Sequence, residues 1–394
     1  MDLWKRLFST FAGLFIVTAC GAAPPASPVL VGLDAEFGHR TSTSAQAIQR
    51  GMEIAIAEIN AAGGVLGGRP LKLVTRDNRS ITARGVDNLR ELAKLPDLVA
   101  VFGGKFSPIY VESLPVVHEL GVPLMDPWGA ADIITDHDYR PSYTFRLSLK
   151  DSWAAPVMLR FAKKTYGAER IGVLLPNTAW GRSNESAIAA AAAELGVELI
   201  GERWYNWGNP SFLRHYLELS RRDAQAILLV GNEPEGALLV KEMAGLPESD
   251  RLPVVSHWGV TGGAFATLAG DALQEIELAV VQTYSFVGRS DPIAKRVLQA
   301  LRERYGVAGP ASVPSPVGVA HAYDLTHLLA RAVNLAGSTD RAAIRHALEH
   351  LGPYQGLVRH YERPFTPERH DALSQEDVFM AYYKEDDQLI PARD

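Results

Sequence analysis

The sequence predicts an α/β protein made of two doubly wound lobes, each with a mostly parallel sheet. Short apolar runs alternate with segments of about 10–15 residues that have helical periodicity, which is typical of βαβ units. The whole pattern restarts after Asp151. A length of 394 residues suits two domains of ordinary size.

The first half of the chain alternates strands and helices. Strands are expected at 29–33, 71–75, 98–102 and 122–125, and helices at 46–62, 83–95 and 108–120. Gly63 and Gly64 end the first helix, as glycines do after a last helical turn. They follow a helix and precede a strand, so they are not a dinucleotide-binding loop, which needs the opposite order.

The second half repeats the alternation. Strands are expected at 170–175, 198–204, 226–230 and 253–257, and helices at 154–165, 183–195, 211–221 and 234–244. The last third adds helices at 292–305, 320–336 and 340–350, with apolar strands at 357–361 and 378–383. Ligands of open α/β sheets bind outside the carboxyl ends of the strands. We therefore expect the functional residues in the loops that follow strands.

Composition excludes several function classes. The formal net charge is −6, and acidic and basic residues are mixed along the chain without a basic stripe, which argues against nucleic acid as a partner. The single cysteine, Cys20, excludes an internal disulfide and a zinc site built from cysteines. The sequence contains neither a phosphate-binding G-x-x-x-x-G-K-[ST] motif nor a G-x-S-x-G elbow, and we expect no cofactor.

The N-terminus has the features of an export signal. Lys5 and Arg6 precede an apolar stretch at 7–18. This stretch is too short for a bilayer-spanning helix, which needs roughly 20 residues, and fits a secretory signal. We expect a signal peptide at 1–19, followed by a Pro-rich tether at 20–28 that does not fold.

The lone cysteine stands where this signal ends. Val17-Thr18-Ala19-Cys20 is similar to a bacterial lipobox, which implies cleavage before Cys20 and lipidation at that residue. Several acyl chains give stable anchoring, whereas one chain holds only marginally. The protein is therefore expected to be exported and lipid-anchored on the periplasmic side of the cell envelope. A plain signal peptide or an uncleaved anchor is the alternative.

One motif raises the possibility of an enzyme. The segment from His346 to His350 fits H-x-x-E-H, in which two histidines four residues apart on a helix bind zinc. Such a site also needs a third ligand, which the sequence does not indicate. We interpret the segment as a solvated helix face and expect neither a metal site nor an enzyme; a metal-dependent hydrolase is the alternative.

Short motifs in a fixed order carry a family resemblance from residue 29 to residue 391. They are Ile59-Asn60-Ala61-Ala62-Gly63-Gly64, Phe102-Gly103-Gly104-Lys105-Phe106-Ser107, Met125-Asp126-Pro127, Trp180-Gly181-Arg182 and Ala322-Tyr323-Asp324. In this order and spacing the chain resembles the leucine/isoleucine/valine-binding type (type I periplasmic) of solute-binding proteins of ABC transporters.

The resemblance implies two lobes joined by three crossover segments, expected near 147–150, 282–286 and 359–365. Lobe 1 would comprise 29–148 plus 285–360, and lobe 2 would comprise 149–284 plus 361–394. It also implies a monomer that binds a small molecule between closing lobes and delivers it to permease subunits. A ligand-sensing receptor subunit of the same fold is the alternative role.

The resemblance also implies ligand-binding positions. Ser107 matches the family's carboxylate-binding serine, although it could instead be an N-cap before Pro108. The full set expected to bind ligand is Phe106, Ser107, Trp128, Ala130, Asp151, Trp180, Asn232, Glu233, Trp258 and Tyr284. Ala130 or Ala131 lies where the family uses a threonine hydroxyl, so that hydroxyl is absent here.

Trp258 is the largest departure from the family pattern. It matches the position of the glutamate that pairs with a ligand ammonium. An unpaired ammonium in a closed cleft would cost several kcal/mol. Either Glu233, Asp151 or Glu36 supplies the acid, or the ligand has no α-ammonium; Trp258 would then stack on the ligand, or belong to the core. We expect a small amino-acid-like, carboxylate or amide metabolite as the ligand.

Overall fold

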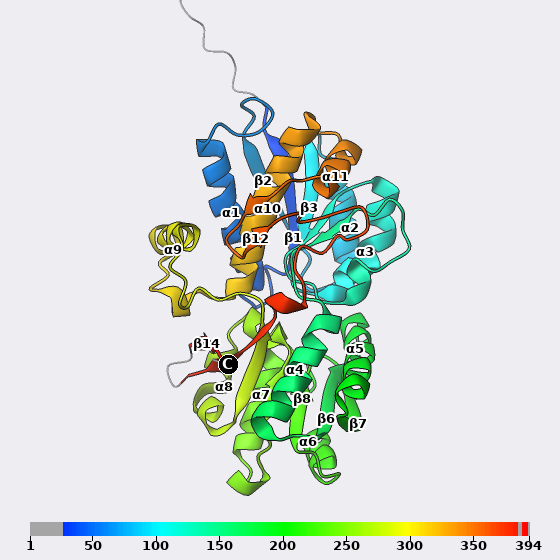
Figure 1. The fold of residues 1–394 in the computed structure, drawn as a ribbon, viewed down its shortest axis with the longest axis vertical. Helices are drawn as coiled ribbons and strands as arrows, with labels where there is room; N and C mark the ends of the chain where they lie inside the picture. Colours follow the sequence, from blue (N-terminus) through cyan, green and yellow to red (C-terminus); the bar gives the residue numbers. More distant parts are fainter. Residues whose placement is uncertain (1–26, 385–387, 393–394) are drawn as a thin grey trace, which may run out of the picture.

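The computed structural model describes residues 27–384 and 388–392 and contains two α/β lobes, one above the other (Figure 1). The expected signal peptide, the expected lipidation site Cys20 and most of the tether lie outside these residues. No helix in the described part of the chain is long and apolar enough to cross a bilayer.

The first lobe contains a five-stranded parallel sheet with the order β2-β1-β3-β4-β5. Its strands are β1 (Val29–Ala35), β2 (Leu71–Asp77), β3 (Leu98–Gly103), β4 (Leu124–Asp126) and β5 (Thr144–Arg146). Its helices are α1 (Ser44–Ala61), α2 (Thr82–Ala93), α3 (Ser107–Leu120), α9 (Pro292–Tyr305), α10 (Pro316–Ala336) and α11 (Arg341–Glu349). Helices α2 and α3 pack on one face, and α1 packs against α10 on the other.

The second lobe contains a seven-stranded sheet with the order β14-β13-β10-β9-β8-β6-β7. Its strands are β6 (Arg170–Pro176), β7 (Glu198–Tyr205), β8 (Ala226–Leu229), β9 (Val254–Ser256), β10 (Leu278–Gln282), β13 (Phe379–Tyr383) and β14 (Leu389–Pro391). Its helices are α4 (Asp151–Tyr166), α5 (Ala179–Leu195), α6 (Leu213–Ser220), α7 (Glu233–Ala244) and α8 (Phe265–Ala269). Strands β6 to β10 are parallel, and β13 and β14 extend the edge in antiparallel pairing.

Both lobes bury the strands on two faces, which explains the near-continuous apolar runs of the sequence. All residues of β3 and β8 are buried, as expected for strands covered by helices on both sides. The carboxyl ends of the parallel strands of both lobes point toward the boundary between the lobes (Figure 1). The fold class expected from the sequence is confirmed.

Several elements differ in extent from the expectation: α10, for example, begins at Pro316 instead of residue 320, and strands β5 and β10 were not expected. Helix α5 begins at Ala179 instead of residue 183, because Thr178 caps it by accepting a hydrogen bond from the Gly181 N–H. Trp180 therefore lies in the first helical turn. The strand expected at 357–361 is reduced to β12 (His360–Tyr361), which pairs with β11 (Tyr354–Gln355) in a separate hairpin.

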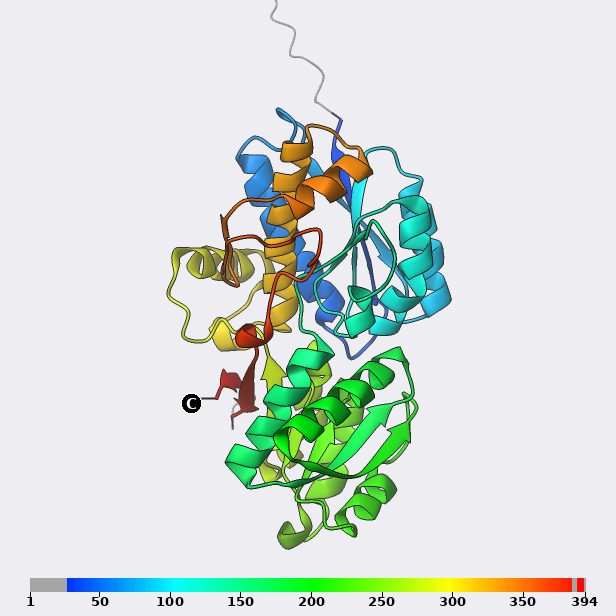
Figure 2. The same cartoon turned by 45° about the vertical axis from the view of Figure 1, so that its right-hand side comes forward.

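The chain passes between the lobes three times. The first passage joins β5 to α4, and the second follows β10. The third passage precedes β13. Phe365 was expected in lobe 2, but its ring packs against Phe145 of lobe 1, with the ring centroids 5.1 Å apart. Figure 2 shows the orange and red segments lying along the first lobe before the chain enters the second. This places the third crossover after residue 372, later than the expected 359–365.

A buried ionic network fastens the first and third passages together. Arg146 is fully buried, and its Nε lies 2.8 Å from Asp371 Oδ1. The Arg146 backbone donates to the His370 carbonyl and accepts from the Ala372 N–H, each at 2.8 Å. Lys150 reaches Asp371 at 3.4 Å. Residues 370–372 are thereby held in lobe 1, which is the physical reason for the later crossover.

Candidate functional site

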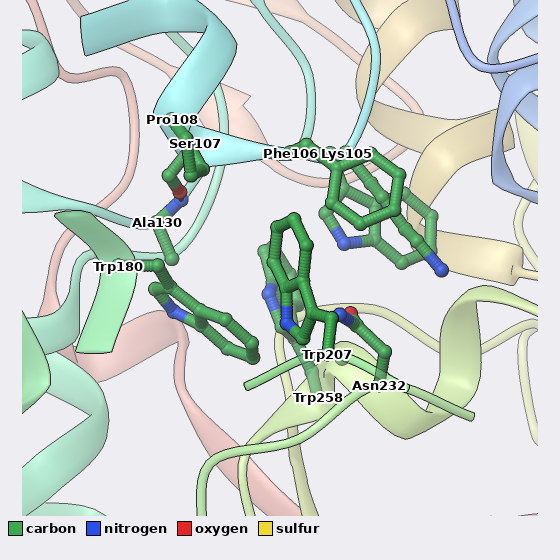
Figure 3. A pocket seen from close by; sticks show the side chains of 11 residues that line it. Lys105, Phe106, Ser107, Pro108, Ala130, Trp180, Trp207, Asn232 and Trp258 are labelled. Atoms are coloured by element: carbon green, nitrogen blue, oxygen red, sulfur yellow. Dashed lines mark hydrogen bonds between the residues drawn. The ribbon is translucent and has the colours of Figure 1, made fainter. Parts of the chain in front are cut away.

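A cavity lies between the lobes at the carboxyl ends of the strands (Figure 3). It is lined by Lys105, Phe106, Ser107, Pro108, Trp128, Ala130, Trp180, Trp207, Asn232, Trp258 and Gly259. These residues follow strands β3 and β4 of the first lobe and strands β6, β7, β8 and β9 of the second. Both lobes therefore build the cavity, as the strand-end rule for α/β sheets requires.

Aromatic rings from the two lobes meet across this cavity. Trp128 of the first lobe and Trp258 of the second have ring centroids 5.5 Å apart, and both are buried. Phe106 and Trp207 make a second pair across the lobes at 5.1 Å. Because the rings fill the cleft, the cavity volume is about 10 Å³, enough for about one water molecule. A ligand of several heavy atoms thus needs the lobes further apart or a turned ring.

Ser107 holds a loop instead of capping its helix. It is the first residue of α3, and the N-cap position is occupied by Phe106. Its hydroxyl oxygen accepts from the backbone N–H groups of Ala130 and Ala131, at 3.1 and 3.2 Å. Both lone pairs are then used, so the hydroxyl proton remains to be donated to an oxygen of a ligand.

A buried ion pair crosses from lobe to lobe beside the cavity. Lys105 Nζ donates to Glu233 Oε2 at 2.5 Å, and the two side chains are 1% and 0% exposed. Thr41 donates to the other oxygen of Glu233 at 3.3 Å. Glu233 was expected to bind ligand directly, but it does not line the cavity, and its charge is directed to Lys105.

Glu36 directly follows β1 and contacts the backbone of Lys105. Its carboxylate accepts hydrogen bonds from the hydroxyl groups of Ser42 and Ser44 and from the Lys105 backbone N–H. A Cβ at Gly104 would lie 2.1 Å from Glu36 Oε2, so only glycine lets the carboxylate approach this loop. Two hydroxyl groups and one backbone N–H, three groups in all, therefore hold Glu36.

Asp151, the third candidate acid, orients a ring of the site. It begins α4 and is fully buried, and Trp180 Nε1 donates to its Oδ1 at 3.2 Å. The same oxygen lies 3.0 Å from His257 Nε2. Asp151 does not line the cavity. Its hydrogen bond to Trp180 orients the indole, which lines the cavity (Figure 3).

Tyr284 lies away from the cavity, in the second crossover. Its ring packs edge-on against Phe286 at 4.9 Å, with the Arg289 guanidinium 5.4 Å from its centroid. Burial raises the pKa of Tyr284 well above its ordinary value. This residue was expected to bind ligand, but in this arrangement it stabilises the crossover.

The side chains of the H-x-x-E-H segment point to different environments. His346 on α11 and His350 directly after it are exposed, with their ring centroids 4.2 Å apart in a stacked arrangement. Glu349 faces the protein interior, where it pairs with Arg345 and lies 3.1 Å from His370 Nε2. Among residues 27–384 and 388–392, no group of three or more His, Cys, Asp or Glu side chains could hold a metal ion.

The comparisons with known proteins agree with this architecture. A family model described as periplasmic binding protein matches residues 31–387. The chain belongs to the periplasmic binding proteins. A curated relative of this family, Leu/Ile/Val-binding protein homolog 1 of Brucella abortus, is 24% identical over 355 residues, which is 90% of each chain. The resemblance to the leucine/isoleucine/valine-binding type is confirmed.

Solved periplasmic binding proteins share the fold. A type 1 periplasmic binding protein from Bordetella pertussis Tohama I has a TM-score of 0.84 at 22% identity, covering 93% of this chain and 100% of its own. A solute-binding protein of an ABC transporter from R. palustris, in complex with 4-hydroxybenzoate, has a TM-score of 0.78 at 18% identity, covering 93% and 96%.

Sequence reasoning missed four residues of the cavity wall. These are Lys105, Pro108, Trp207 and Gly259. Each lies within a few residues of the end of a strand, so the strand-end rule could have found them. The family resemblance drew attention to other positions instead. Trp207 in particular follows an edge strand, next to Gly208, whose φ of 78° places it in the left-handed region.

Proposed function

We propose that this periplasmic binding protein is the lipid-anchored solute receptor of an ABC importer. We further propose that its ligand is a small carboxylate or amide with an apolar or aromatic body, not an α-amino acid. It would act as a monomer, close on its ligand by hinge motion and deliver it to permease subunits. The membership of the family supports the transport role, and the chemistry of the cleft supports the ligand class.

The engagement of Glu233 and Glu36 by groups of the protein carries this proposal. An α-ammonium in the closed cleft would need a carboxylate partner. Glu233 is paired with Lys105, and Glu36 is bound by serine hydroxyl groups. Asp151 accepts from Trp180 through Oδ1; its buried Oδ2 has no hydrogen-bond partner among the described residues, but Asp151 does not line the cavity. Trp258 stands at the position expected for the family's acid and is buried against Trp128. Ser107 retains a donor for a carbonyl or carboxylate oxygen, and the tryptophans offer flat walls.

Truncation of Trp258 tests this ligand class. Native protein should be stabilised in a thermal-shift screen by aromatic carboxylates or amides, by about 2.7 kcal/mol at 100 times Kd. Trp258→Ala should weaken binding of the best of these ligands by about 1–3 kcal/mol in titration calorimetry, because it removes a buried aromatic anchor.

Trp153→Ala is the matched control for this variant. Trp153 is half-buried on α4 and lies outside the cavity lining, so its loss should leave the affinity unchanged. Tight leucine or valine binding by native protein that survives Trp258→Ala would refute the proposed ligand class. It would show that one of the three acids leaves its partner to meet an ammonium.

The lipid anchor gives a second test. Cys20→Ser removes the thiol that lipidation requires, so the variant should appear in the soluble fraction, whereas the native protein should partition into the detergent phase. Metabolic labelling with a palmitate analogue should mark only the native chain. A Cys20→Ser variant that stays in the detergent phase would rule out the proposed anchor.

A further inference from the structure

The charge of the cavity wall depends on a single cation. Lys105 is the one charged side chain among the described residues that line the cavity. Its ammonium lies 5.1 Å from the Phe106 ring centroid, on the side of the cavity that the first lobe builds. In isolation, such a group would attract a carboxylate strongly and define an anion site.

That cation is already neutralised by the protein. Glu233 Oε2 lies 2.5 Å from Lys105 Nζ, and neither side chain is exposed to solvent beyond 1%. Glu36 accepts the Lys105 backbone N–H and adds a second carboxylate to the same region. His39 Nδ1 lies 4.0 Å from Glu233 Oε1, so the imidazole also faces this carboxylate. The cavity wall around Lys105 therefore has no unpaired positive charge that could bind an anionic ligand.

The remaining polar groups of the cavity are uncharged. Ser107 can donate its hydroxyl proton, because Ala130 and Ala131 occupy its lone pairs. Trp207 Nε1 is buried and has no partner within the described residues. Asn232 offers one acceptor and two donors. Such a set matches a carbonyl oxygen and an N–H group, whereas a buried anion would lack a counter-charge.

From this geometry we infer that the site selects a ligand without charged groups, and that an amide binds in preference to the corresponding carboxylate. The inference rests on the proposed function and narrows its ligand class. A zwitterion fits less well because its ammonium would have to separate Glu233 from Lys105, which leaves the lysine unpaired in the closed cleft.

The test compares matched pairs of probes that differ only in charge: acetamide with acetate, and benzamide with benzoate. Calorimetry on the native protein should show tighter binding of the amide of at least one pair. Glu233→Gln keeps the shape of the side chain and frees the Lys105 charge. The ratio of carboxylate to amide affinity should then rise roughly tenfold to a hundredfold. A change in lobe closure affects both members of a pair and cancels in this ratio.

Three further variants make the result specific. Glu242→Gln removes a carboxylate from the far end of the same helix, where Glu242 accepts the Phe212 N–H, and should leave the ratio unchanged. Lys105→Gln should lower the ratio of carboxylate to amide affinity, because the negative charge of Glu233 then has no counter-charge and repels a carboxylate. The double variant Lys105→Gln with Glu233→Gln restores neutrality and should return the ratio toward the native value. Lys105→Gln alone decides the matter if Glu233→Gln does not fold.

The two proposals fail in different ways. Native protein that binds the carboxylate more tightly than the amide in both pairs, or a ratio that Glu233→Gln and Lys105→Gln both leave unchanged, overturns the selection of uncharged ligands alone. Native protein that binds none of the four probes and instead binds leucine overturns the proposed ligand class.

Discussion

Lys105→Met should open the ligand-free protein. In the closed arrangement it leaves Glu233 buried without a counter-charge, which costs about 3–5 kcal/mol for a pair of this kind. The variant can avoid that cost by separating the lobes, because water then solvates the carboxylate. The pair is 1% and 0% exposed, so the closed state gains nothing from solvent screening. We expect the equilibrium to shift toward the open form by at least a hundredfold.

Small-angle X-ray scattering of ligand-free protein measures this shift as an increased radius of gyration. Lys105→Met combined with Glu233→Gln is the control, because two neutral side chains carry no such penalty and should close again. Backbone hydrogen bonds at the same edge remain in all variants: Thr43 N–H to Gly262 O and Ala264 N–H to Thr41 O, each at 2.8 Å. Identical scattering from native protein and Lys105→Met would show that these bonds, and not the ion pair, hold the lobes together.

Arg146→Met should destabilise the whole molecule. Burial alone would lower the pKa of Arg146, but the nearby carboxylates, above all Asp371, raise it above its ordinary value. The guanidinium also donates to the Ala131 and Asp132 carbonyls. Removing it leaves Asp371 and these carbonyls unpaired next to the first and third crossovers. A loss of about 3–5 kcal/mol in the free energy of unfolding is expected.

Urea denaturation followed by tryptophan fluorescence measures that loss. Arg214→Met is the matched control, because Arg214 is 87% exposed and pairs with Glu218 on the surface. Pairs of this kind contribute about 0.3–0.5 kcal/mol. A loss below about 1 kcal/mol in Arg146→Met would mean that the network is not what joins the crossovers. Burial would raise the pKa of Asp371, but Arg146 and Lys150 hold it below its ordinary value. Such a small loss would mean that the buried Asp371 carboxylate does not need Arg146 as its partner.

Periodicity and composition by themselves determined the α/β class, the two lobes and most helix bounds. Buried parallel strands must be apolar on both faces and helices must repeat every 3.6 residues, so both leave a local signal. The same logic, with the family resemblance, brought Ser107, Trp128, Trp180 and Trp258 to the cleft, since they follow strands whose carboxyl ends share one edge.

Only the tertiary structure decided which charges meet. Lys105 and Glu233 are 128 residues apart and lie in different lobes, so no local pattern joins them. Glu233 was expected to face a ligand and instead neutralises Lys105. Likewise Asp371 holds the third crossover in lobe 1 by pairing with Arg146, 225 positions away along the chain. Coulomb attraction between buried groups depends on distance in space and on desolvation, and the sequence specifies neither until the chain has folded.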